Sequence, residues 1–340
     1  MAMVQGEKHR VCLVNPMRNP SFPPLNLAML AAYARARCRH PIDIRIVDVN
    51  FSKDPVGEVV AFDPVFVGFT ALSPFMLDAI RLNGEMKRAR ARHASACGGI
   101  HATVAPGDVL RHGFDVAVIG EGEQTLVDLI DLAIEGGGEL DRAGLAGVDG
   151  IAYLDGGEMR TTAPRELVDD LDQMPHAARE LLSPRYYDLF FMSRGATSNR
   201  FHTIHGSRAC PFKCIFCCVN FTVKSKVRRH SPEYIVDEME ELVRRYKARW
   251  VWFTDDTFFV DKKHTAEMCE LIIARGLHRK IKWDAQIRSS LIKEGDIDLL
   301  KLMRRASCRH IDIGFESFNA RMLSVIKGNN IKPEDHHRAI

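Results

Sequence analysis

The 340-residue sequence lacks a strong excess of charge, a signal peptide and a long apolar run. Its 47 Lys and Arg nearly balance its 44 Asp and Glu, so the net charge of +3 does not indicate nucleic acid or an anionic membrane as a partner. The polar residues 1–10 have no signal-peptide core, and no apolar run approaches the length of a membrane span. We therefore expect a cytoplasmic protein that neither binds nucleic acid nor spans a membrane.

Cysteine is too sparse for a disulfide scaffold, since the chain has nine. Four of the nine fall within residues 210–218. The others stand singly in mostly apolar surroundings, where a cysteine usually behaves as a small buried hydrophobic residue. This prediction applies to Cys12, Cys38, Cys97, Cys269 and Cys308.

Short apolar runs alternate with helical patterns in the first part of the chain, as is typical of parallel strands joined by crossover helices. The predicted strands are 11–14, 42–47, 65–69, 96–98, 116–119 and 150–154, and the predicted helices are 26–36, 76–91 and 124–134. The sequence thus predicts an α/β fold whose residues 1–150 form a doubly wound, Rossmann-like or flavodoxin-like parallel sheet.

A second alternation begins after residue 200. Residues 136–157 are rich in Gly and Asp, and three prolines follow by residue 184, so we expect a linker or wrapping segment over 151–200. The predicted strands that follow are 201–205, 250–254, 282–287 and 311–315, and the predicted helices are 232–246, 263–274 and 297–305. Residues 201–340 therefore predict four strand–helix units of a second domain.

The clustered cysteines include the spacing Cys-x3-Cys-x2-Cys at Cys210, Cys214 and Cys217. Thiolates this close in sequence wrap one soft metal centre on a single loop. Iron–sulfur clusters usually take four cysteines, so three would leave one iron open for chemistry. The alternative is a structural zinc site completed by Cys218, which is awkward beside Cys217, or by His202 or His205.

This motif, at the end of the first strand of an expected (β/α) barrel and with Phe216 before its last cysteine, resembles the signature of the radical S-adenosylmethionine (SAM) family. The resemblance implies a [4Fe–4S] cluster whose open iron binds SAM, and reductive cleavage of SAM to a radical. Later strand ends resemble the family's SAM-binding segments, and barrel active sites lie at such ends. The residues implied in SAM binding are Asp255, Asp256, Arg288, Glu316 and Ser317.

The loops of the first domain resemble those of the cobalamin-binding domain that precedes the barrel in one large radical SAM subfamily. Small residues after strand ends suit a flat corrin, which the backbone must approach closely. No Asp-x-His-x-x-Gly motif is present, so the resemblance implies cobalamin bound without a protein histidine on cobalt. The residues implied in cobalamin binding are Asn15, Ser73, Gly98, Gly99, His101, Gly120, Glu121 and Gly122.

Together these resemblances imply an enzyme that acts on a small-molecule or natural-product substrate. The implied reaction is methyl transfer to an unactivated carbon, with an electron donor such as flavodoxin or ferredoxin. Radical cyclisation or rearrangement, and a non-catalytic cobalamin or metal sensor, are the alternatives. A radical SAM barrel usually has six units, so we expect this one to be truncated after the fourth.

Overall fold

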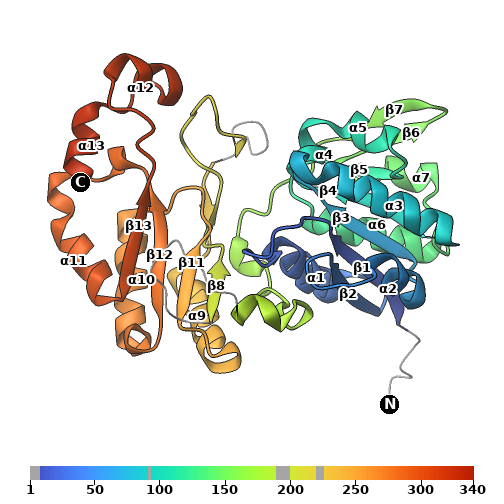
Figure 1. Ribbon diagram of the computed structural model, residues 1–340, viewed down its shortest axis with the longest axis horizontal. Helices are drawn as coiled ribbons and strands as arrows, with labels where there is room; N and C mark the ends of the chain where they lie inside the picture. The colour runs from blue at the N-terminus through green and yellow to red at the C-terminus, as the bar shows by residue number, and fades with distance from the viewer. Residues whose placement is uncertain (1–7, 91–92, 189–199, 220–225) are drawn as a thin grey trace. The chain divides into compact units, whose positions relative to one another are not determined.

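The computed structural model describes residues 8–90, 93–188, 200–219 and 226–340. The chain divides into two compact units (Figure 1). The first comprises Met1–Leu167 and Met174–Pro184, and the second comprises Val168–Gln173 and Arg185–Ile340. The segment predicted as a linker, 151–200, is thus shared between the two units, and the predicted boundary at 150 falls inside the first.

The first unit is a seven-stranded sheet in the order β2-β1-β3-β4-β5-β6-β7. β1 to β5 are parallel in a flavodoxin-like order, as predicted. β6 and β7 pair antiparallel, so the expectation of a wholly parallel sheet was wrong at this edge. The elements are β1 His9–Asn15, α1 Leu25–Arg37, β2 Ile42–Asp48, α2 Pro55–Phe62, β3 Phe66–Thr70, α3 Met76–Arg90, β4 Ala94–Gly98, α4 Ile100–Val104, α5 Pro106–Arg111, β5 Val116–Val118, α6 Glu123–Glu135, α7 Arg142–Ala146, β6 Ile151–Asp155 and β7 Glu158–Thr161.

The central strands form because their side chains are buried on both faces of the sheet. All five residues of β3 are buried, which matches the continuous apolar runs expected of parallel strands covered by helices. Helix α1 lies against α6, and α2 lies against α3. Helix α2 was missed by the sequence analysis, although Asp54 caps it by accepting a hydrogen bond from Gly57 N at 2.8 Å.

The second unit contains a parallel sheet in the order β13-β12-β11-β8 and a two-stranded ribbon of β9 and β10. Each strand of the larger sheet leads to a helix, so the described part of this unit contains four strand–helix units. The elements are β8 Phe201–Ile204, β9 Ser207–Arg208, β10 Arg228–Arg229, α9 Pro232–Tyr246, β11 Trp250–Phe253, α10 Lys262–Ala274, β12 Lys282–Ile287, α11 Ile297–Arg305, β13 Cys308–Ile313, α12 Ala320–Lys327 and α13 Pro333–Ala339. Short 3-10 turns across the two units span Ser73–Phe75, Leu171–Gln173, Arg179–Leu181, Pro184–Asp188, Leu277–Arg279, Ser289–Leu291 and Glu294–Asp296.

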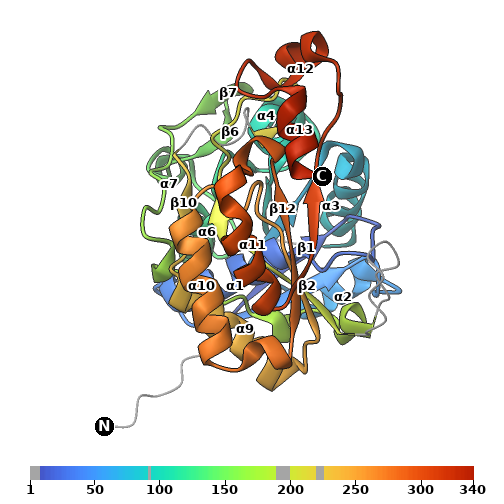
Figure 2. The same ribbon diagram turned by 90° about the vertical axis from the view of Figure 1, so that its left-hand side faces the viewer.

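Helices α9, α10 and α11 lie side by side on the second sheet (Figure 2). Helix α9 starts as predicted, with Ser231 accepting from Tyr234 N at 3.1 Å and Pro232 in the first turn. Phe253 and Trp283 are buried and meet edge to face, with ring centroids 5.6 Å apart. The core of this unit therefore sits between the sheet and these helices.

The connecting segment is fixed to each unit by different contacts. Residues 168–173 join the second unit, where Arg228 Nη1 donates to Val168 O at 2.7 Å and Ser231 N donates to Asp172 Oδ1 at 2.9 Å. Residues 174–184 join the first unit, where Ala178 N donates to Ala28 O at 3.0 Å. Among the described residues, no helix is both long and apolar enough to cross a membrane.

A fragment of residues 1–184 is expected to unfold cooperatively, whereas a fragment of residues 1–150 should be less stable by roughly 3–6 kcal/mol. The shorter fragment loses the buried side chains Ile151 and Tyr153 of β6 and leaves β5 as an unpaired edge. Urea unfolding followed by circular dichroism measures the difference. A 1–167 fragment controls for the 174–184 segment, and equal stability of 1–150 and 1–184 would contradict the expectation.

Candidate functional site

The three cysteines of the predicted cluster follow the first strand of the second unit. The chain leaves β9 through Ala209, which is buried and has φ of 72°. A positive φ is unusual for a residue with a side chain and marks a sharp change of direction. Cys210 comes next, and the loop then closes a turn in which Cys217 N donates to Cys214 O at 3.1 Å.

The thiols of this loop differ in exposure. Cys210, Cys214 and Cys217 are partly buried, whereas Cys218 is exposed. The pKa of the Cys210 and Cys217 thiols is raised chiefly by burial, and also by Asp256 and neighbouring thiols. Coordination to iron removes the proton and supplies the missing charge partner. This set of three soft donors therefore fits an iron–sulfur cluster.

Within the described ranges, no three His, Cys, Asp or Glu side chains are grouped closely enough to hold a metal ion. Each cysteine of a [4Fe–4S] cluster binds a different iron, so its sulfurs are spaced more widely than those around one zinc ion. The two histidines considered for zinc have other contacts. The His202 ring stacks on Tyr187 with centroids 4.2 Å apart, and His205 Nδ1 lies 3.2 Å from Thr254 Oγ1.

The predicted SAM-binding residues all follow the carboxyl ends of the parallel strands. Asp255 and Asp256 follow β11, Arg288 follows β12, and Glu316 and Ser317 follow β13. Because parallel strands have their carboxyl ends at one edge, these residues share an edge with the cysteine loop that follows β8. The observed β13 starts and ends earlier than the predicted strand 311–315.

Asp255 supports this edge rather than facing a ligand. It is 3% exposed, and it accepts hydrogen bonds from Gly206 N at 3.0 Å and from the Ser207 hydroxyl. These bonds join the end of β11 to the turn between β8 and β9. Asp256, by contrast, is exposed and lies within electrostatic reach of Cys210 and Cys217.

The other predicted SAM-binding residues already have partners within the chain. Arg288 Nη1 donates to Cys214 Sγ at 3.1 Å. Glu316 has φ of 56° and forms an ion pair with the buried Lys327, which sequence reasoning missed. Ser317 Oγ accepts from Asn319 N at 3.1 Å. Only the tertiary fold, with α12 returning to this edge, could have identified Lys327.

The predicted cobalamin-binding residues lie at the carboxyl edge of the first sheet. Asn15 is buried at the end of β1 and donates to Asp48 Oδ2 at 3.1 Å. Gly98 ends β4, and Glu121 and Gly122 lead into α6. The Asn15 side chain is thus bonded to the end of the neighbouring strand β2. Gly98 and Gly122 have no side chain to cover their backbone at this edge.

Two of these glycines have conformations that favour glycine. Gly99 has φ of 97°, and an added Cβ would lie 2.9 Å from Ala71 O. Gly120 has φ of 81° and open space where a Cβ would be. Thr103 links the two loops, since its Oγ1 donates to Gly99 O and accepts from Gly120 N, both at 3.0 Å. Gly99 is thus required by the close approach of the loop after β3, whereas the open space at Gly120 fits a flat ring lying against the edge.

Both ring nitrogens of His101 are engaged. Nδ1 lies 3.0 Å from Ser73 Oγ, and Nε2 lies 3.0 Å from Asp108 Oδ2. The hydrogen bond from His101 is the main cause that lowers the pKa of Asp108. His101 therefore joins the loops after β3 and β4, and it does not present a ring nitrogen for cobalt.

Sequence reasoning missed three apolar side chains beside these loops. Leu72 follows β3, Leu77 is in the first turns of α3, and Val104 ends α4. They are 39%, 78% and 50% exposed, although large apolar side chains are usually covered. Exposed apolar residues next to open backbone indicate a surface that binds an apolar, ring-shaped partner.

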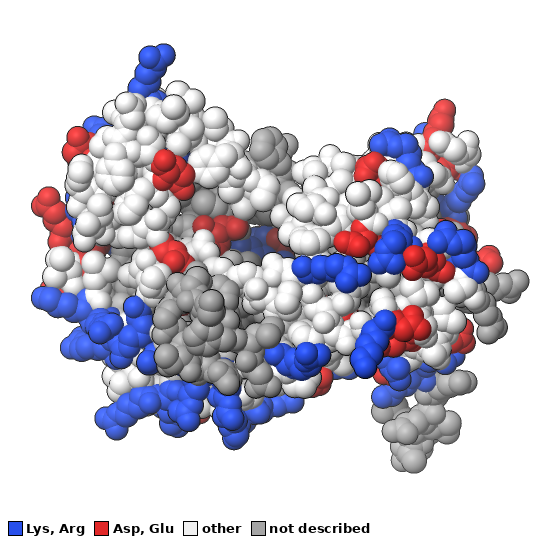
Figure 3. Space-filling model, in the orientation of Figure 1, with Lys and Arg blue, Asp and Glu red and all other residues white. Residues whose placement is uncertain are grey.

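A basic cavity lies at the opposite end of the second sheet. Its volume is about 440 Å³, and Arg249 and Lys282 line it at the starts of β11 and β12. Arg279, Lys280 and Arg309 add positive charge, and Lys and Arg side chains gather in the lower left of Figure 3. Because this cavity lies at the amino ends of the strands, it is separate from the cysteine loop.

The buried Asp255 predicts a pH-dependent stability. Burial is the main cause that raises its pKa to about 6, and the hydrogen bonds from Ser207 and Gly206 oppose this shift by stabilising the carboxylate. An unfolded aspartate titrates near pH 3.9, so the stabilising contribution is complete below about pH 4 and is lost as the pH rises through about 6. Relative to Asp255→Asn, the metal-free chain should lose roughly 1–3 kcal/mol between pH 4 and pH 7. Urea unfolding of both proteins at pH 4 and pH 7 measures this change in the free energy of unfolding. An equal change in the unaltered chain and in Asp255→Asn would contradict the prediction.

Two sequence families match this chain. A B12 binding domain matches residues 17–130, and the radical SAM superfamily matches residues 204–340. The matched ranges correspond to the two structural units, which carry the glycine loops and the cysteine loop, respectively.

The chain is similar to two curated relatives over most of its length. The chain is 32% identical over 325 residues to the uncharacterized methyltransferase PH0819 of Pyrococcus horikoshii, covering 94% of this chain and 66% of that protein. It is 32% identical over 257 residues to the anaerobic magnesium-protoporphyrin IX monomethyl ester cyclase of Cereibacter sphaeroides, covering 75% of this chain and 40% of that protein. The chain thus spans about 40–66% of the length of these relatives.

A solved structure supports the fold assignment. The radical SAM methyltransferase TsrM from Kitasatospora setae, solved with cobalamin and a [4Fe–4S] cluster bound, superposes with a TM-score of 0.78 at 19% identity, covering 98% of this chain and 66% of that chain. At this identity the likeness concerns the fold. The two family matches show that the chain belongs to the cobalamin-binding group of the radical SAM superfamily, in which a B12 binding domain precedes the radical SAM domain.

Proposed function

We propose that this protein is a cobalamin-dependent radical SAM methyltransferase acting on a carbon of a small organic substrate. The observation that carries the proposal is the position of Cys210, Cys214 and Cys217 on one loop at the carboxyl edge of the second sheet. A [4Fe–4S] cluster held there supplies the electron for reductive cleavage of SAM, and cobalamin supplies the methyl group. The protein's own part is to bind, orient and shield these groups.

The cysteine loop is suited to hold the cluster through three thiolates. The loop is fixed at its start by the bonds from Gly206 and Ser207 to Asp255. Further along, Ile215 N donates to Ile326 O at 3.0 Å, which ties the loop to α12. These contacts fix the loop on either side of Cys210 and Cys214, and all three thiols, including Cys217 two residues beyond Ile215, are only partly buried.

SAM is proposed to bind at the same edge, beside Asp256, Glu316 and Ser317. Asp256 is exposed near two of the thiols, where a carboxylate suits the SAM amino group. Lys327 fixes Glu316 by an ion pair and donates to Gly314 O at 2.5 Å, so the turn after β13 has a defined shape. Asp255 acts in this proposal as support for the cysteine loop.

Cobalamin is proposed to lie on the carboxyl edge of the first sheet. The open space at Gly120 and the exposed Leu72, Leu77 and Val104 support this position. The hydrogen bonds of His101 to Ser73 and Asp108 support binding without histidine on cobalt. Glu121, Gly122 and Gly98 would contribute backbone at the same edge.

The relatives favour methyl transfer and also support one alternative. The hopanoid C-3 methylase of Methylococcus capsulatus is 25% identical over 307 residues. Radical ring closure is the second candidate, because a cyclase is among the relatives at 32% identity. A flavodoxin- or ferredoxin-type electron donor would serve either reaction. Isotope-labelled SAM separates the two, since a labelled methyl group appears in the product only if methyl transfer occurs.

Each alanine substitution at Cys210, Cys214 or Cys217 should abolish the assembled cluster, because only these three partly buried thiols fit the loop arrangement. Iron and sulfide analysis after anaerobic reconstitution, with absorbance near 400 nm, measures the loss. Cys218→Ala is the matched control and should keep the iron content of the unaltered protein. An equal loss of iron in Cys218→Ala would favour a four-thiolate site instead.

His101→Ala should leave the electron paramagnetic resonance spectrum of bound cob(II)alamin unchanged, because both of its ring nitrogens have protein partners. The chain is titrated with cobalamin, and the nitrogen splitting on cobalt is compared in the two proteins. Loss of nitrogen splitting in His101→Ala would assign the histidine to cobalt.

Gly120→Leu places a side chain in the open space and should weaken cobalamin binding about tenfold or more.

A further inference from the structure

Arg288 is a buried cation whose contacts point to a role beyond SAM binding. It directly follows β12 and is 7% exposed. Burying a guanidinium is costly unless its N–H groups find partners and its charge is balanced. The identity of these partners therefore indicates what the residue does.

The guanidinium makes four hydrogen bonds to neutral acceptors. Nε donates to Ser290 Oγ at 3.0 Å, and Nη2 donates to Lys327 O at 3.2 Å and to Asn330 Oδ1 at 3.0 Å. Nη1 donates to Cys214 Sγ at 3.1 Å. Four of its five N–H donors are thus engaged, so the side chain is held in one orientation.

The same group packs on the cysteine loop through its face. The Arg288 guanidinium carbon lies 4.2 Å from the centroid of the Phe212 ring, two residues before Cys214. A cation over an aromatic face is attracted by the ring and fixes both groups. Arg288 therefore contacts the loop at two places.

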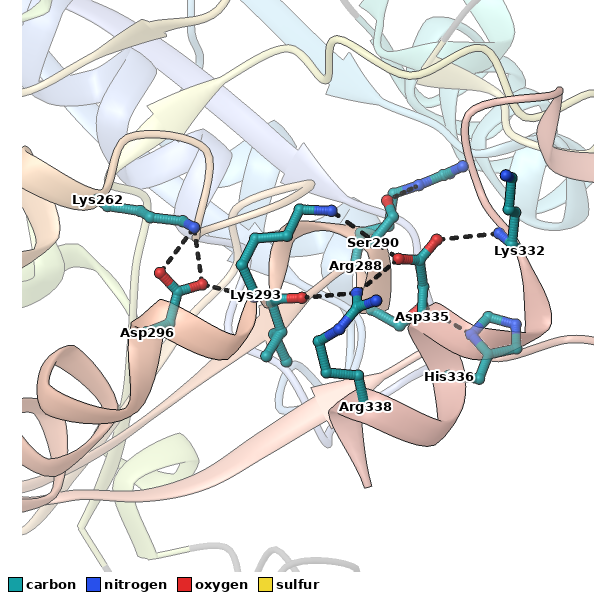
Figure 4. Close-up of polar contacts among 11 residues, drawn as sticks. Lys262, Arg288, Ser290, Lys293, Asp296, Lys332, Asp335, His336 and Arg338 are labelled. Atoms are coloured by element: carbon teal, nitrogen blue, oxygen red, sulfur yellow. Dashed lines mark hydrogen bonds and ion pairs between the residues drawn. The ribbon is translucent and has the colours of Figure 1, made fainter.

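The turn that carries Arg288 is itself fixed. Ser289 Oγ lies 2.7 Å from His336 Nδ1, which joins this turn to α13. Figure 4 shows Arg288 and Ser290 beside α13, and Arg338 of this helix also contacts the turn, since its Nη1 donates to Ile292 O at 3.4 Å. The turn that carries Arg288 is thus joined to α13 by two side chains.

Within the described residues, the charge of Arg288 has no carboxylate partner. Across the ranges that the structure describes, Arg288 forms no ion pair with an Asp or Glu side chain. Of its four acceptors, only the Cys214 sulfur gains negative charge on binding iron. The buried cation thus faces the one partner that becomes anionic when a cluster is bound.

We propose that Arg288 is a positioning residue that holds Cys214 as a cluster ligand and raises the reduction potential of the cluster. This inference rests on the proposed function. Reduction adds one negative charge to the cluster, and a nearby buried cation stabilises the reduced state more than the oxidised one. Hydrogen bonds to ligand sulfurs act in the same direction. The role differs from the SAM binding that the family resemblance implies for Arg288, in which its guanidinium would pair with the SAM carboxylate.

The test is the midpoint potential of the reconstituted cluster, measured by redox titration with electron paramagnetic resonance. Arg288→Gln should shift it to more negative values, with about a tenfold lower ratio of reduced to oxidised cluster at a fixed solution potential. Arg288→Lys keeps the charge and should restore part of the shift. Lys213→Gln removes an exposed charge beside Cys214 and should cause little change, because water screens that charge.

A second variant covers the case in which the Arg288 variants assemble no cluster. Asn330→Ala removes one anchor of the guanidinium and should shift the potential in the same direction by a smaller amount. An unchanged potential in Arg288→Gln overturns the inference, as does an equal shift in Lys213→Gln. If the Arg288 variants hold no iron, an unchanged potential in Asn330→Ala overturns it. Lost SAM affinity with an unchanged potential would return Arg288 to the SAM carboxylate. If the unaltered protein assembles no cluster at all, the proposed function fails with it.

Discussion

Parallel strands place all of their carboxyl ends at one edge of a sheet, and both units of this protein depend on that constraint. In the first unit it brings together the loops after β3, β4 and β5, which Thr103 and His101 then join by hydrogen bonds. In the second unit it brings Asp255 and Arg288 to the cysteine loop. Residues far apart in sequence become neighbours because each follows a strand of the same direction.

Buried polar groups then determine how the loops are shaped at this edge. Asp255 satisfies Gly206 N and the Ser207 hydroxyl, and Lys327 satisfies Gly314 O and Glu316. Such groups are costly to bury without partners, so each bond restricts the loop to conformations that keep it. The edge of the second unit is thus shaped by a few polar contacts on a hydrophobic sheet.

The sequence predicts most strands because their burial produces apolar runs, as in β3, but it predicts strands with exposed side chains poorly and missed β7, whose four residues are all exposed. β13 contains exposed Arg309 and His310, so its apolar pattern begins late, and the prediction placed it at 311–315 instead of Cys308–Ile313. Cysteine spacing alone leads to the proposal of three cluster thiols, since ligand sets on one loop depend on local separation in the sequence. The partners of Arg288 could not be predicted, because Lys327 is 39 residues away and reaches it only through the packing of α12.

The cysteine loop depends on polar contacts because little apolar packing covers it. Ile215 and Phe216 are 62% and 58% exposed, so burial of their side chains stabilises the loop little. Its order comes from the bonds of Ile215 N to Ile326 O and of Arg288 to Cys214, and from Phe212 beneath the guanidinium. Metal binding would add three bonds to a segment with few other constraints, so cluster assembly and loop ordering are coupled. The contacts of Arg288 lower the entropic cost of that coupling, because they hold one of the three ligands before the others bind.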